Sequence, residues 1–320
     1  MASPATVRFC NQDIPRDAER VDCVNVKVAD LAPLRELSKL RELRLWITNP
    51  HEHIEHGLAD LSPLAGLAHL EVLALSRSEI EDLGALAGLT NLRRLDVGQT
   101  PVRDLSPLQG LKNLTHLDLG STRVADLSPL RGLERLAELD ITNTPVEDLG
   151  PVIDLPAIRD AETLDLTGTR IRTLAGLEKA TRLKDLRLIN APVSDLTPLR
   201  SLTGLTSLRL DNTEVRDLTP LAGLTALQRL TLSGTAVEDL SPLGGLTALR
   251  VLNLERTPVR DLGPLRNLTG LEELNLAETA CTDLGPLAGL KNLARLILRK
   301  TAGAPAAEDL RRQLPGLEIV

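Results

Sequence analysis

The stretch LSPLQGLKNLTHLDLGSTRVAD (residues 105–126) is followed directly by LSPLRGLERLAELDITNTPVED (residues 127–148), and both share one 22-residue frame. The frame recurs from Leu61 nearly to the C-terminus, and an earlier copy begins at Leu31. The regular copies begin at Leu61, Leu83, Leu105, Leu127, Leu149, Leu174, Leu196, Leu218, Leu240, Leu262 and Leu284. A fixed period of this length indicates small units that bury their apolar faces only by stacking on one another.

Each copy contains a short stretch in which apolar and polar residues alternate. In Leu117-Asp118-Leu119 the leucines point inward and the aspartate outward, as in a β-strand. A period in the twenties with L-x-x-L-x-L in every copy is the signature of leucine-rich repeats. We therefore predict an α/β solenoid, a right-handed leucine-rich-repeat horseshoe. Twelve parallel strands form one concave sheet, preceded by a partial strand at residues 21–23, and short 3-10 or turn segments lie on the convex side.

Two recurrent polar positions have structural explanations. An aspartate stands just before the convex segment in most copies: Asp82, Asp104, Asp126, Asp148, Asp195, Asp217, Asp239, Asp261 and Asp283. Its carboxylate is suited to accept the free N–H groups of a short helical turn. A threonine follows most of the predicted strands: Thr100, Thr122, Thr144, Thr169, Thr213, Thr235, Thr257, Thr279 and Thr301. We expect its hydroxyl to bond the backbone of the turn.

The ends of the chain depart from the frame. We assign residues 1–30 to an N-terminal cap, residues 31–307 to about twelve repeats, and residues 308–320 to a C-terminal cap made of a short helix and a last strand. Terminal units of a solenoid cover its exposed core, so we expect a complete protein. Insertions fall near residues 48–57 and 153–162.

The unit T-x-V-x-D-L-S/T-P-L-x-G-L-x-x-L-x-x-L-x-L resembles the short repeats of bacterial internalins and is similar to the leucine-rich regulatory subunit of protein phosphatase 1. The resemblance covers about residues 21–320, although those relatives usually carry asparagine where this chain has threonine. It implies a module that is not an enzyme and whose concave face docks another protein. Internalins are secreted and anchored, but no signal or anchor is visible here, so the resemblance supports the binding mode only.

The amino-acid composition limits the classes of partner that we expect the protein to bind. The formal charge is −7, which argues against nucleic acid or an anionic membrane. Aromatic residues make up 1% of the chain, so we expect a leucine core and a polar, salt-sensitive interface. No signal peptide or membrane-spanning segment is visible, which predicts a cytoplasmic protein. Cys10 and Cys23 can pair in an oxidising compartment, but the inward position of Cys23 favours a reduced core thiol.

The outward strand positions are the candidate binding face, because stacking does not dictate them. Their centre holds four consecutive aspartates followed by two arginines, which suits a partner whose basic segment precedes an acidic one. Adjacent carboxylates about 4.8 Å apart repel by roughly 3.5 kcal/mol at an effective dielectric of 20. Gly98 and Gly120 leave room beside the acids. The alternative is a solvated polar face. The partner-binding candidates are Trp46, Arg94, Asp96, His116, Asp118, Asp140, Asp165, Arg187, Arg209 and Asp211.

Two other features stand near the first insertion. Trp46 takes an outward position, where it is either a contact residue or covered by the insertion. The segment NPHEHIEHG (residues 49–57) holds His51, His53 and His56, which are weak candidates for a metal-dependent hydrolase with Glu52 or Glu55. Their spacing does not match H-E-x-x-H, so we favour a protein-contacting or solvated loop and predict no cofactor.

A third hypothesis is an exported effector or adhesin, which needs an unconventional secretion signal in residues 1–20. The oligomeric state stays open.

Overall fold

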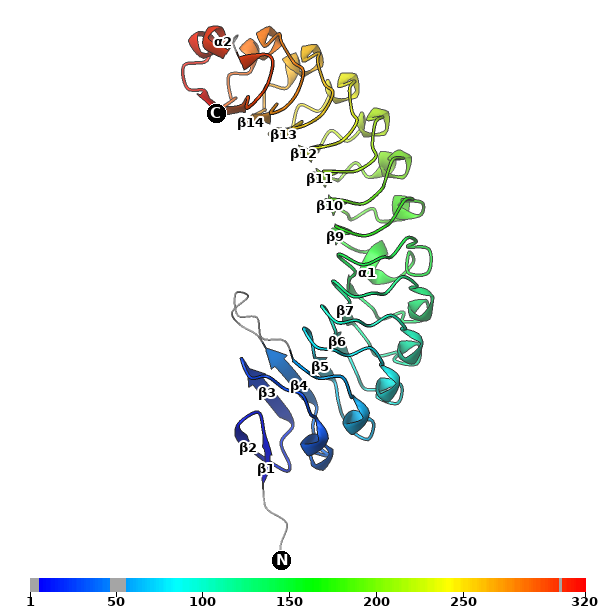
Figure 1. The fold of residues 1–320 in the computed structure, drawn as a ribbon. Helices are drawn as coiled ribbons and strands as arrows, with labels where there is room; N and C mark the ends of the chain where they lie inside the picture. The colour runs from blue at the N-terminus through cyan, green and yellow to red at the C-terminus, as the bar shows by residue number, and fades with distance from the viewer. Residues whose placement is uncertain (1–5, 47–55, 305–306) are drawn as a thin grey trace, which may run out of the picture. The chain divides into compact units, whose positions relative to one another are not determined.

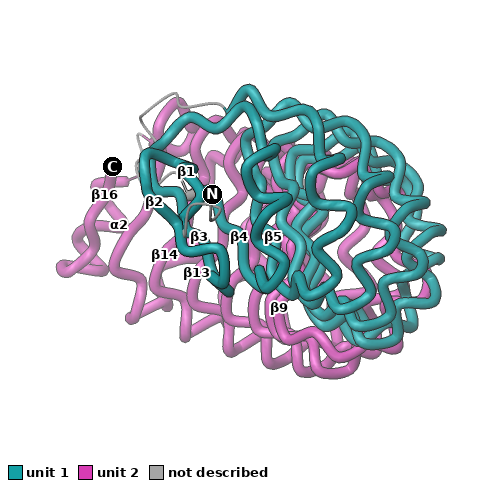
Figure 2. Tube along the Cα trace, turned by 90° about the horizontal axis from the view of Figure 1, so that it is seen from below, with its two compact units in different colours: residues 1–158 teal, residues 159–320 magenta. Residues whose placement is uncertain are grey.

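The computed structural model describes residues 6–46, 56–304 and 307–320, without the side chain of Trp46 (Figure 1). The chain divides into two compact units, residues 1–158 and residues 159–320 (Figure 2). Both consist of short parallel strands that alternate with 3-10 turns, which confirms the leucine-rich-repeat solenoid.

Unit 1 begins with the antiparallel hairpin of β1 (Thr6–Phe9) and β2 (Gln12–Pro15). A six-stranded parallel sheet follows, in which every strand pairs with the next along the chain. Its strands are β3 (Arg20–Val24), β4 (Glu42–Trp46), β5 (Val72–Ala74), β6 (Arg94–Asp96), β7 (His116–Asp118) and β8 (Glu138–Asp140). Its 3-10 turns are η1 (Ala32–Glu36), η2 (Ser62–Leu64), η3 (Gly84–Leu86), η4 (Ser106–Leu108) and η5 (Ser128–Leu130).

Unit 2 contains an eight-stranded parallel sheet and ends with helix α2 (Ala307–Gln313) before its last strand. Its strands are β9 (Thr163–Asp165), β10 (Asp185–Arg187), β11 (Ser207–Arg209), β12 (Arg229–Thr231), β13 (Val251–Asn253), β14 (Glu273–Asn275), β15 (Arg295–Ile297) and β16 (Glu318–Ile319). Its 3-10 turns are η6 (Leu177–Lys179), η7 (Thr197–Ser201), η8 (Thr219–Leu221), η9 (Ser241–Leu243), η10 (Gly263–Asn267) and η11 (Gly285–Gly289).

The prediction of one continuous sheet is wrong, because strand pairing ends at β8 and resumes at β9. The copy that begins at Leu149 is three residues longer than the others. This copy keeps a turn after its first leucine, where the N–H of Val152 bonds the carbonyl of Leu149 at 2.9 Å, and helix α1 (Pro156–Arg159) follows in the connection to β9. Because this copy is longer, β8 and β9 are not separated by the regular 22 residues that keep the neighbouring strands of regular copies in register.

The core of each unit is a stack of leucines. In unit 1 the central leucines Leu73, Leu95 and Leu117 pair in register and are 0–2% exposed. Phe9 is the aromatic residue of the described core, at 5% exposure. Burial of aliphatic side chains at about 25 cal/mol per Å² is therefore the main favourable contribution to folding.

Polar side chains fix the turns as the sequence predicts. Asp104 accepts hydrogen bonds from the N–H (2.8 Å) and the hydroxyl (2.7 Å) of Ser106, and these bonds lower the pKa of its carboxyl. Buried Thr122 donates its hydroxyl to the carbonyl of Leu119 at 2.7 Å. The same two arrangements recur along the chain. Both predicted structural ladders are confirmed.

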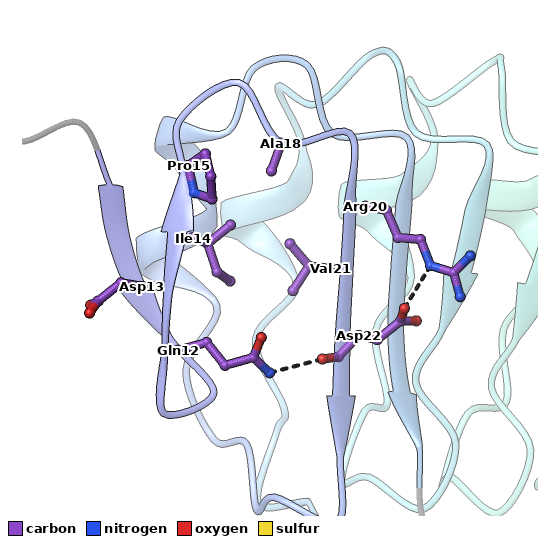
Figure 3. A pocket seen from close by; sticks show the side chains of 8 residues that line it. All are labelled: Gln12, Asp13, Ile14, Pro15, Ala18, Arg20, Val21 and Asp22. Carbon is purple, nitrogen blue, oxygen red and sulfur yellow. Dashed lines mark hydrogen bonds and ion pairs between the residues drawn. The ribbon is translucent and has the colours of Figure 1, made fainter.

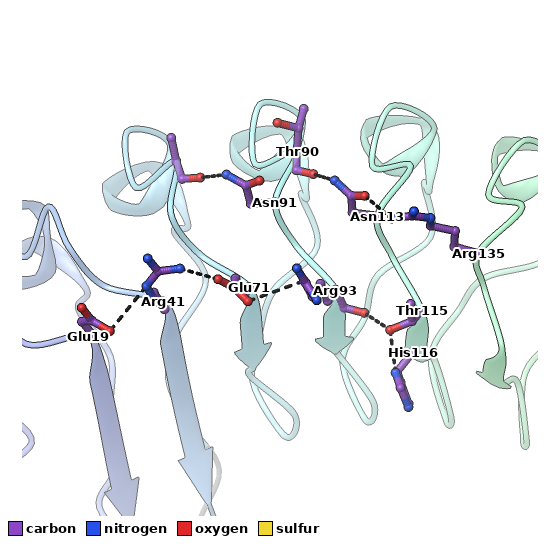
Figure 4. Close-up of polar contacts among 11 residues, drawn as sticks. Glu19, Arg41, Glu71, Thr90, Asn91, Arg93, Asn113, Thr115, His116 and Arg135 are labelled. Atoms are coloured by element: carbon purple, nitrogen blue, oxygen red, sulfur yellow. Dashed lines mark hydrogen bonds and ion pairs between the residues drawn. The ribbon is translucent and has the colours of Figure 1, made fainter.

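Charged side chains also tie neighbouring copies in unit 1. Glu71 lies between Arg41 and Arg93, with oxygen–nitrogen distances of 2.6 and 3.5 Å, and Arg41 also contacts Glu19 at 3.4 Å (Figure 4). Each of these residues directly precedes one of the strands β3 to β6. Because these pairs are largely exposed, each contributes at most about 1 kcal/mol.

The expectation of a reduced thiol at Cys23 is wrong, because Cys23 forms a disulfide with Cys10. The hairpin β1–β2 packs beside the first turn η1 and brings Cys10 to β3, with a Cα–Cα distance of 5.7 Å. Cys23 is fully buried, so its inward position is as predicted. Cys281 is a buried free thiol.

Candidate partner-binding face

We define the sheet face as the surface formed by the outward side chains of the strands. In unit 1, β6, β7 and β8 pair so that Asp96, Asp118 and Asp140 are neighbours. We call these three residues the acidic stripe. Strand pairing does not place Asp165 beside Asp140, because β9 belongs to the other sheet. The stripe therefore holds three carboxylates in register, not the expected four.

Each carboxylate of the acidic stripe also caps the end of its own strand. One oxygen accepts a hydrogen bond from the backbone N–H two residues further on. The pairs are Asp96 with Gly98 (3.0 Å), Asp118 with Gly120 (2.8 Å) and Asp140 with Thr142 (2.8 Å). This capping role was not predicted, although the recurrence of Asp and Asn at this position was a signal for it.

The space at Gly98 and Gly120 is filled by the acids themselves. A Cβ atom at Gly98 would lie 3.0 Å from Oδ1 of Asp118, and one at Gly120 would lie 3.2 Å from the same atom. Glycine thus lets the carboxylates fold back against the backbone. The sequence-based interpretation of this space as room for a ligand is wrong.

Crowding and burial change the acidity of the stripe. Burial is the largest cause that raises the pKa of Asp118, opposed by the hydrogen bond from the N–H of Gly120, and with the neighbouring carboxylates Asp96 and Asp140 the pKa reaches about 6. Burial also raises the pKa of Asp96, opposed by the N–H of Gly98 and by Arg94. Asp118 therefore changes its charge at about pH 6 instead of near its ordinary pKa of 3.8.

The other candidates of unit 1 surround the stripe. Arg94 is exposed at the start of β6. His116 contacts Glu138 (3.1 Å) through Nε2 and the hydroxyl of Thr115 (2.8 Å) through Nδ1 (Figure 4). Trp46 ends β4, where it pairs with Val24, and its side chain lies outside the described residues.

In unit 2 the candidates form a mixed cluster. Arg187 bonds Asp185 at 2.8 Å and Asp165 at 3.4 Å, so two carboxylates neutralise it. The carboxylate of Asp211 extends to β12, where it accepts a hydrogen bond from the hydroxyl of Thr231. The guanidinium of Arg209 has no hydrogen bond or ion pair with any described residue, and its Nε is buried.

The histidine segment is only partly described. His51 and His53 lie outside the described residues. His56 is fully buried, its backbone N–H donates to the carbonyl of Arg77 (2.9 Å), and its ring Nδ1 accepts a hydrogen bond from the backbone N–H of Val28 (3.2 Å). The expectation of a solvated His56 is therefore wrong.

His56 is poorly suited to bind a metal ion. Its Nδ1 lone pair is already used by the N–H of Val28. Among the described residues, no group of three His, Cys, Asp or Glu side chains is arranged to hold a metal ion.

A hollow of 330 Å³ lies at the N-terminal cap between β2 and β3 (Figure 3). Ile14 and Val21 face each other across it, and Gln12 bridges to the carbonyl of Asp22 at 3.2 Å. Arg20 at its rim is paired with Asp22 at 2.6 Å. The other carboxylate of the lining, Asp13, is paired with Arg8 at 3.3 Å, so the hollow is a seam of the cap. Separately, no helix in the described part of the chain has the length and apolar character that a membrane span requires.

Comparisons with known proteins agree with this architecture. The family model for leucine-rich repeats (two copies) matches residues 112–154 and 225–267. An internalin (InlF) from Listeria monocytogenes is 28% identical, with a TM-score of 0.80, and the match covers 97% of this chain and 89% of that one. No curated protein matches the sequence.

Two more distant structures share the fold. The LRIM1/APL1C complex has a TM-score of 0.71 at 17% identity, covering 95% of this chain and 56% of that one. The plant peptide hormone receptor RGFR1 in complex with RGF2 has a TM-score of 0.65 at 15% identity, covering 86% and 50%. The repeats, the two parallel sheets and these likenesses together show that the chain has a leucine-rich-repeat solenoid fold similar to that of an internalin.

Proposed function

We propose that the chain is a protein-binding scaffold without catalytic activity and that the sheet face of unit 1 docks a partner through the acidic stripe. Leucine-rich-repeat domains are typical protein-binding scaffolds, and the LRIM1/APL1C and RGFR1–RGF2 structures are complexes of such proteins. Their likeness to this chain concerns the fold alone.

The observation that carries the proposal is a charge that the fold does not need. In unit 2, Asn253 and Asn275 cap their strands by the same bond, at 3.0 and 2.9 Å. Asparagine thus supplies the capping oxygen without a charge. The acidic stripe instead places three carboxylates on adjacent strands, against mutual repulsion and against the desolvation that raises the pKa of Asp118. A function other than capping explains that charge.

The stripe fits a basic segment of a partner protein. Lysine or arginine side chains would neutralise the three carboxylates and remove their repulsion. Charged contacts of this kind give specificity and association rate more than affinity, and salt weakens them. The shortage of aromatic side chains agrees with such a polar interface.

Affinity capture from native-cell lysate tests the proposal. The baits are wild type, Asp118→Asn/Asp140→Asn on the sheet face, and the matched control Asp104→Asn/Asp126→Asn on the turns. Both variants remove two charges, and the first retains the capping oxygens. We expect a partner that is lost from the sheet-face variant only and is weakened between 50 and about 300 mM salt. Capture of the same proteins by all three baits would refute the acidic stripe as the docking site.

A further inference from the structure

Most repeat strands of unit 2 share one capping arrangement, which is absent at β10 and β11, where arginines take the capping position, and at β15, where Ile297 takes it. At β9, β13 and β14 the outward central side chain accepts the backbone N–H two residues on. The pairs are Asp165 with Thr167 (3.0 Å), Asn253 with Glu255 (3.0 Å) and Asn275 with Ala277 (2.9 Å). At β12, where Thr231 takes this position, Asp211 of the preceding copy accepts the N–H of Ser233 at 3.0 Å. In each of these copies, the backbone N–H two residues after the central strand position therefore points to the sheet face.

Arginines take the capping position in β10 and β11. An arginine side chain has five donors and no acceptor, so Arg187 and Arg209 cannot cap their strands. The N–H groups of Ile189 and Asp211 consequently have no acceptor in the described part of the chain. They follow neighbouring strands, so they lie roughly 4.8 Å apart.

The nearby carboxylates do not fill this gap. Asp185 and Asp165 hold Arg187, and Asp211 bonds Thr231 and Ser233 of the next copy. One oxygen of Asp185 and the hydroxyl of Ser207 are buried without partners, and these two residues stand opposite each other in register. Even if they pair, Arg209 and the two N–H groups still lack an acceptor.

We propose that Arg209 and the backbone N–H groups of Ile189 and Asp211 form a binding site for one carboxylate, supplied by an Asp or Glu side chain of the partner protein. We call it the carboxylate site. The ligand restores in trans the oxygen that Asp165, Asn253 and Asn275 supply within their own copies, and it adds a charge-assisted bond to Arg209. The assignment to a partner rests on the proposed function, whereas the site itself does not.

Local charge favours a carboxylate over a phosphate. The cluster holds the acids Asp165, Asp185 and Asp211 and the arginines Arg187, Arg209 and Arg229 on adjacent strands. Its formal charge is three minus three, or zero. A dianion would face three carboxylates without a net positive charge, whereas a single carboxylate needs only the unpaired Arg209.

The site is testable in the free protein. The probes are N-acetyl-aspartate N-methylamide and the corresponding asparagine compound, titrated into isotope-labelled full-length chain. We expect the aspartate compound, at millimolar concentration, to shift the amide resonances of Ile189 and Asp211 and the Nε–H of Arg209 in a saturable way. An equal response to the asparagine compound, or no saturable shift at these groups, overturns the proposal.

Substitutions separate binding from a structural role. Arg209→Asn introduces the acceptor that Asn253 and Asn275 provide, so we expect unchanged or higher thermal stability and at least a tenfold weaker response at Ile189 and Asp211. Arg295→Gln, on β15 of the same face, is the matched control and should respond as wild type. An unchanged response in Arg209→Asn, or a clear loss of stability, contradicts the proposal.

Affinity capture tests separately whether the carboxylate that binds at the carboxylate site belongs to the partner protein. We expect Arg209→Asn to weaken capture of the partner that the acidic stripe binds. If the probe saturates in wild type but capture is unaffected by Arg209→Asn, the carboxylate site exists and its assignment to the partner is wrong. If capture is unaffected by Asp118→Asn/Asp140→Asn, the proposed function itself is wrong, whether or not the probe binds at the carboxylate site.

Discussion

At the scale of single residues, the central outward position of each strand combines two tasks. Its side chain can cap the strand end, and it sets the charge of the sheet face. Asp118 and Asn253 cap in the same way but differ in charge, whereas Arg209 carries charge and cannot cap. The identity of this one residue therefore decides both the local hydrogen bonding and the surface chemistry of a copy.

Asp118 makes unit 1 less stable at neutral pH than at mildly acidic pH. Its pKa in the folded chain, about 6, exceeds its ordinary value of 3.8, so the folded state retains a proton that the unfolded state has lost. Its contribution is fully favourable below pH 3.8 and is lost as the pH rises through 6. We expect Asp118→Asn to raise the free energy of unfolding at pH 7.5 by about 1–3 kcal/mol and to change it little at pH 4.

Denaturant unfolding of wild type and variant between pH 4 and 7.5 measures this difference. Asp140→Asn, which also retains the cap but lies at an exposed site of the stripe, is the control and should have a smaller effect. A pH-independent effect of Asp118→Asn would show that the proton at Asp118 is not responsible.

Residue patterns predicted part of this site. The alternation in Leu117-Asp118-Leu119 was enough to place Asp118 outward and beside its neighbours in register. It did not predict that the carboxylate turns back to the N–H of Gly120, because strand alternation fixes the side of a residue and not its rotamer. The pairing of Arg187 with Asp165 and Asp185, which leaves Arg209 without a partner, likewise depends on side-chain packing.

At the scale of elements, the N-terminal cap is where the sequence is least informative. Residues 6–15 lie outside the repeat, so no copy elsewhere in the chain indicates their structure. The inward position of Cys23 was predictable, but its bond to Cys10 depends on how the hairpin β1–β2 packs.

Reduction of this disulfide should destabilise the cap. The bond joins residues 13 positions apart, and in the chain-entropy view a loop of this size contributes about 3 kcal/mol. We expect a phosphine reductant to increase hydrogen exchange at β1, β2 and β3 while β13 and β14 stay protected. Equal exchange in both redox states would show that the hairpin is held by packing alone.

His56 gives unit 1 a second pH dependence, of opposite sign to that of Asp118. Burial lowers its pKa below 6.5, so the unfolded state binds a proton first as the pH falls. Its contribution is fully present above pH 6.5 and is lost on acidification. We expect His56→Asn, which offers an oxygen to the N–H of Val28, to be less stable at pH 7.5 but to lose less stability between pH 7.5 and 5.5. Parallel curves for variant and wild type in denaturant unfolding would contradict this.

At the scale of the whole molecule, the repeat predicted the solenoid and its twelve repeat strands, β4 to β15. The division into two sheets was not predicted. The three additional residues after Leu149 were visible, but an insertion of that length can form a loop without interrupting the strand pairing. Here the connection folds into α1 and pairing stops.

Cytoplasmic localisation stays a prediction, and Cys10 and Cys23 provide a test. Disulfides persist mainly in oxidising compartments. Alkylation of thiols in native cells lysed directly into denaturant without reductant, read by mass spectrometry, should find both cysteines alkylated if the chain is cytoplasmic. Recovery of the two cysteines as one linked peptide would instead favour the exported alternative. Cys281, a buried free thiol, becomes accessible only after denaturation and serves as the internal control.

The equivalence of Asp and Asn as strand caps has a consequence for how such a chain diversifies. A codon for aspartate becomes one for asparagine by a single base change, and the capping oxygen is retained. Each copy can thus gain or lose a surface charge while its fold is preserved, so the pattern along the sheets can drift toward a new ligand one copy at a time. A combinatorial library limited to these two residues at the capping positions would sample many charge patterns with few unfolded members.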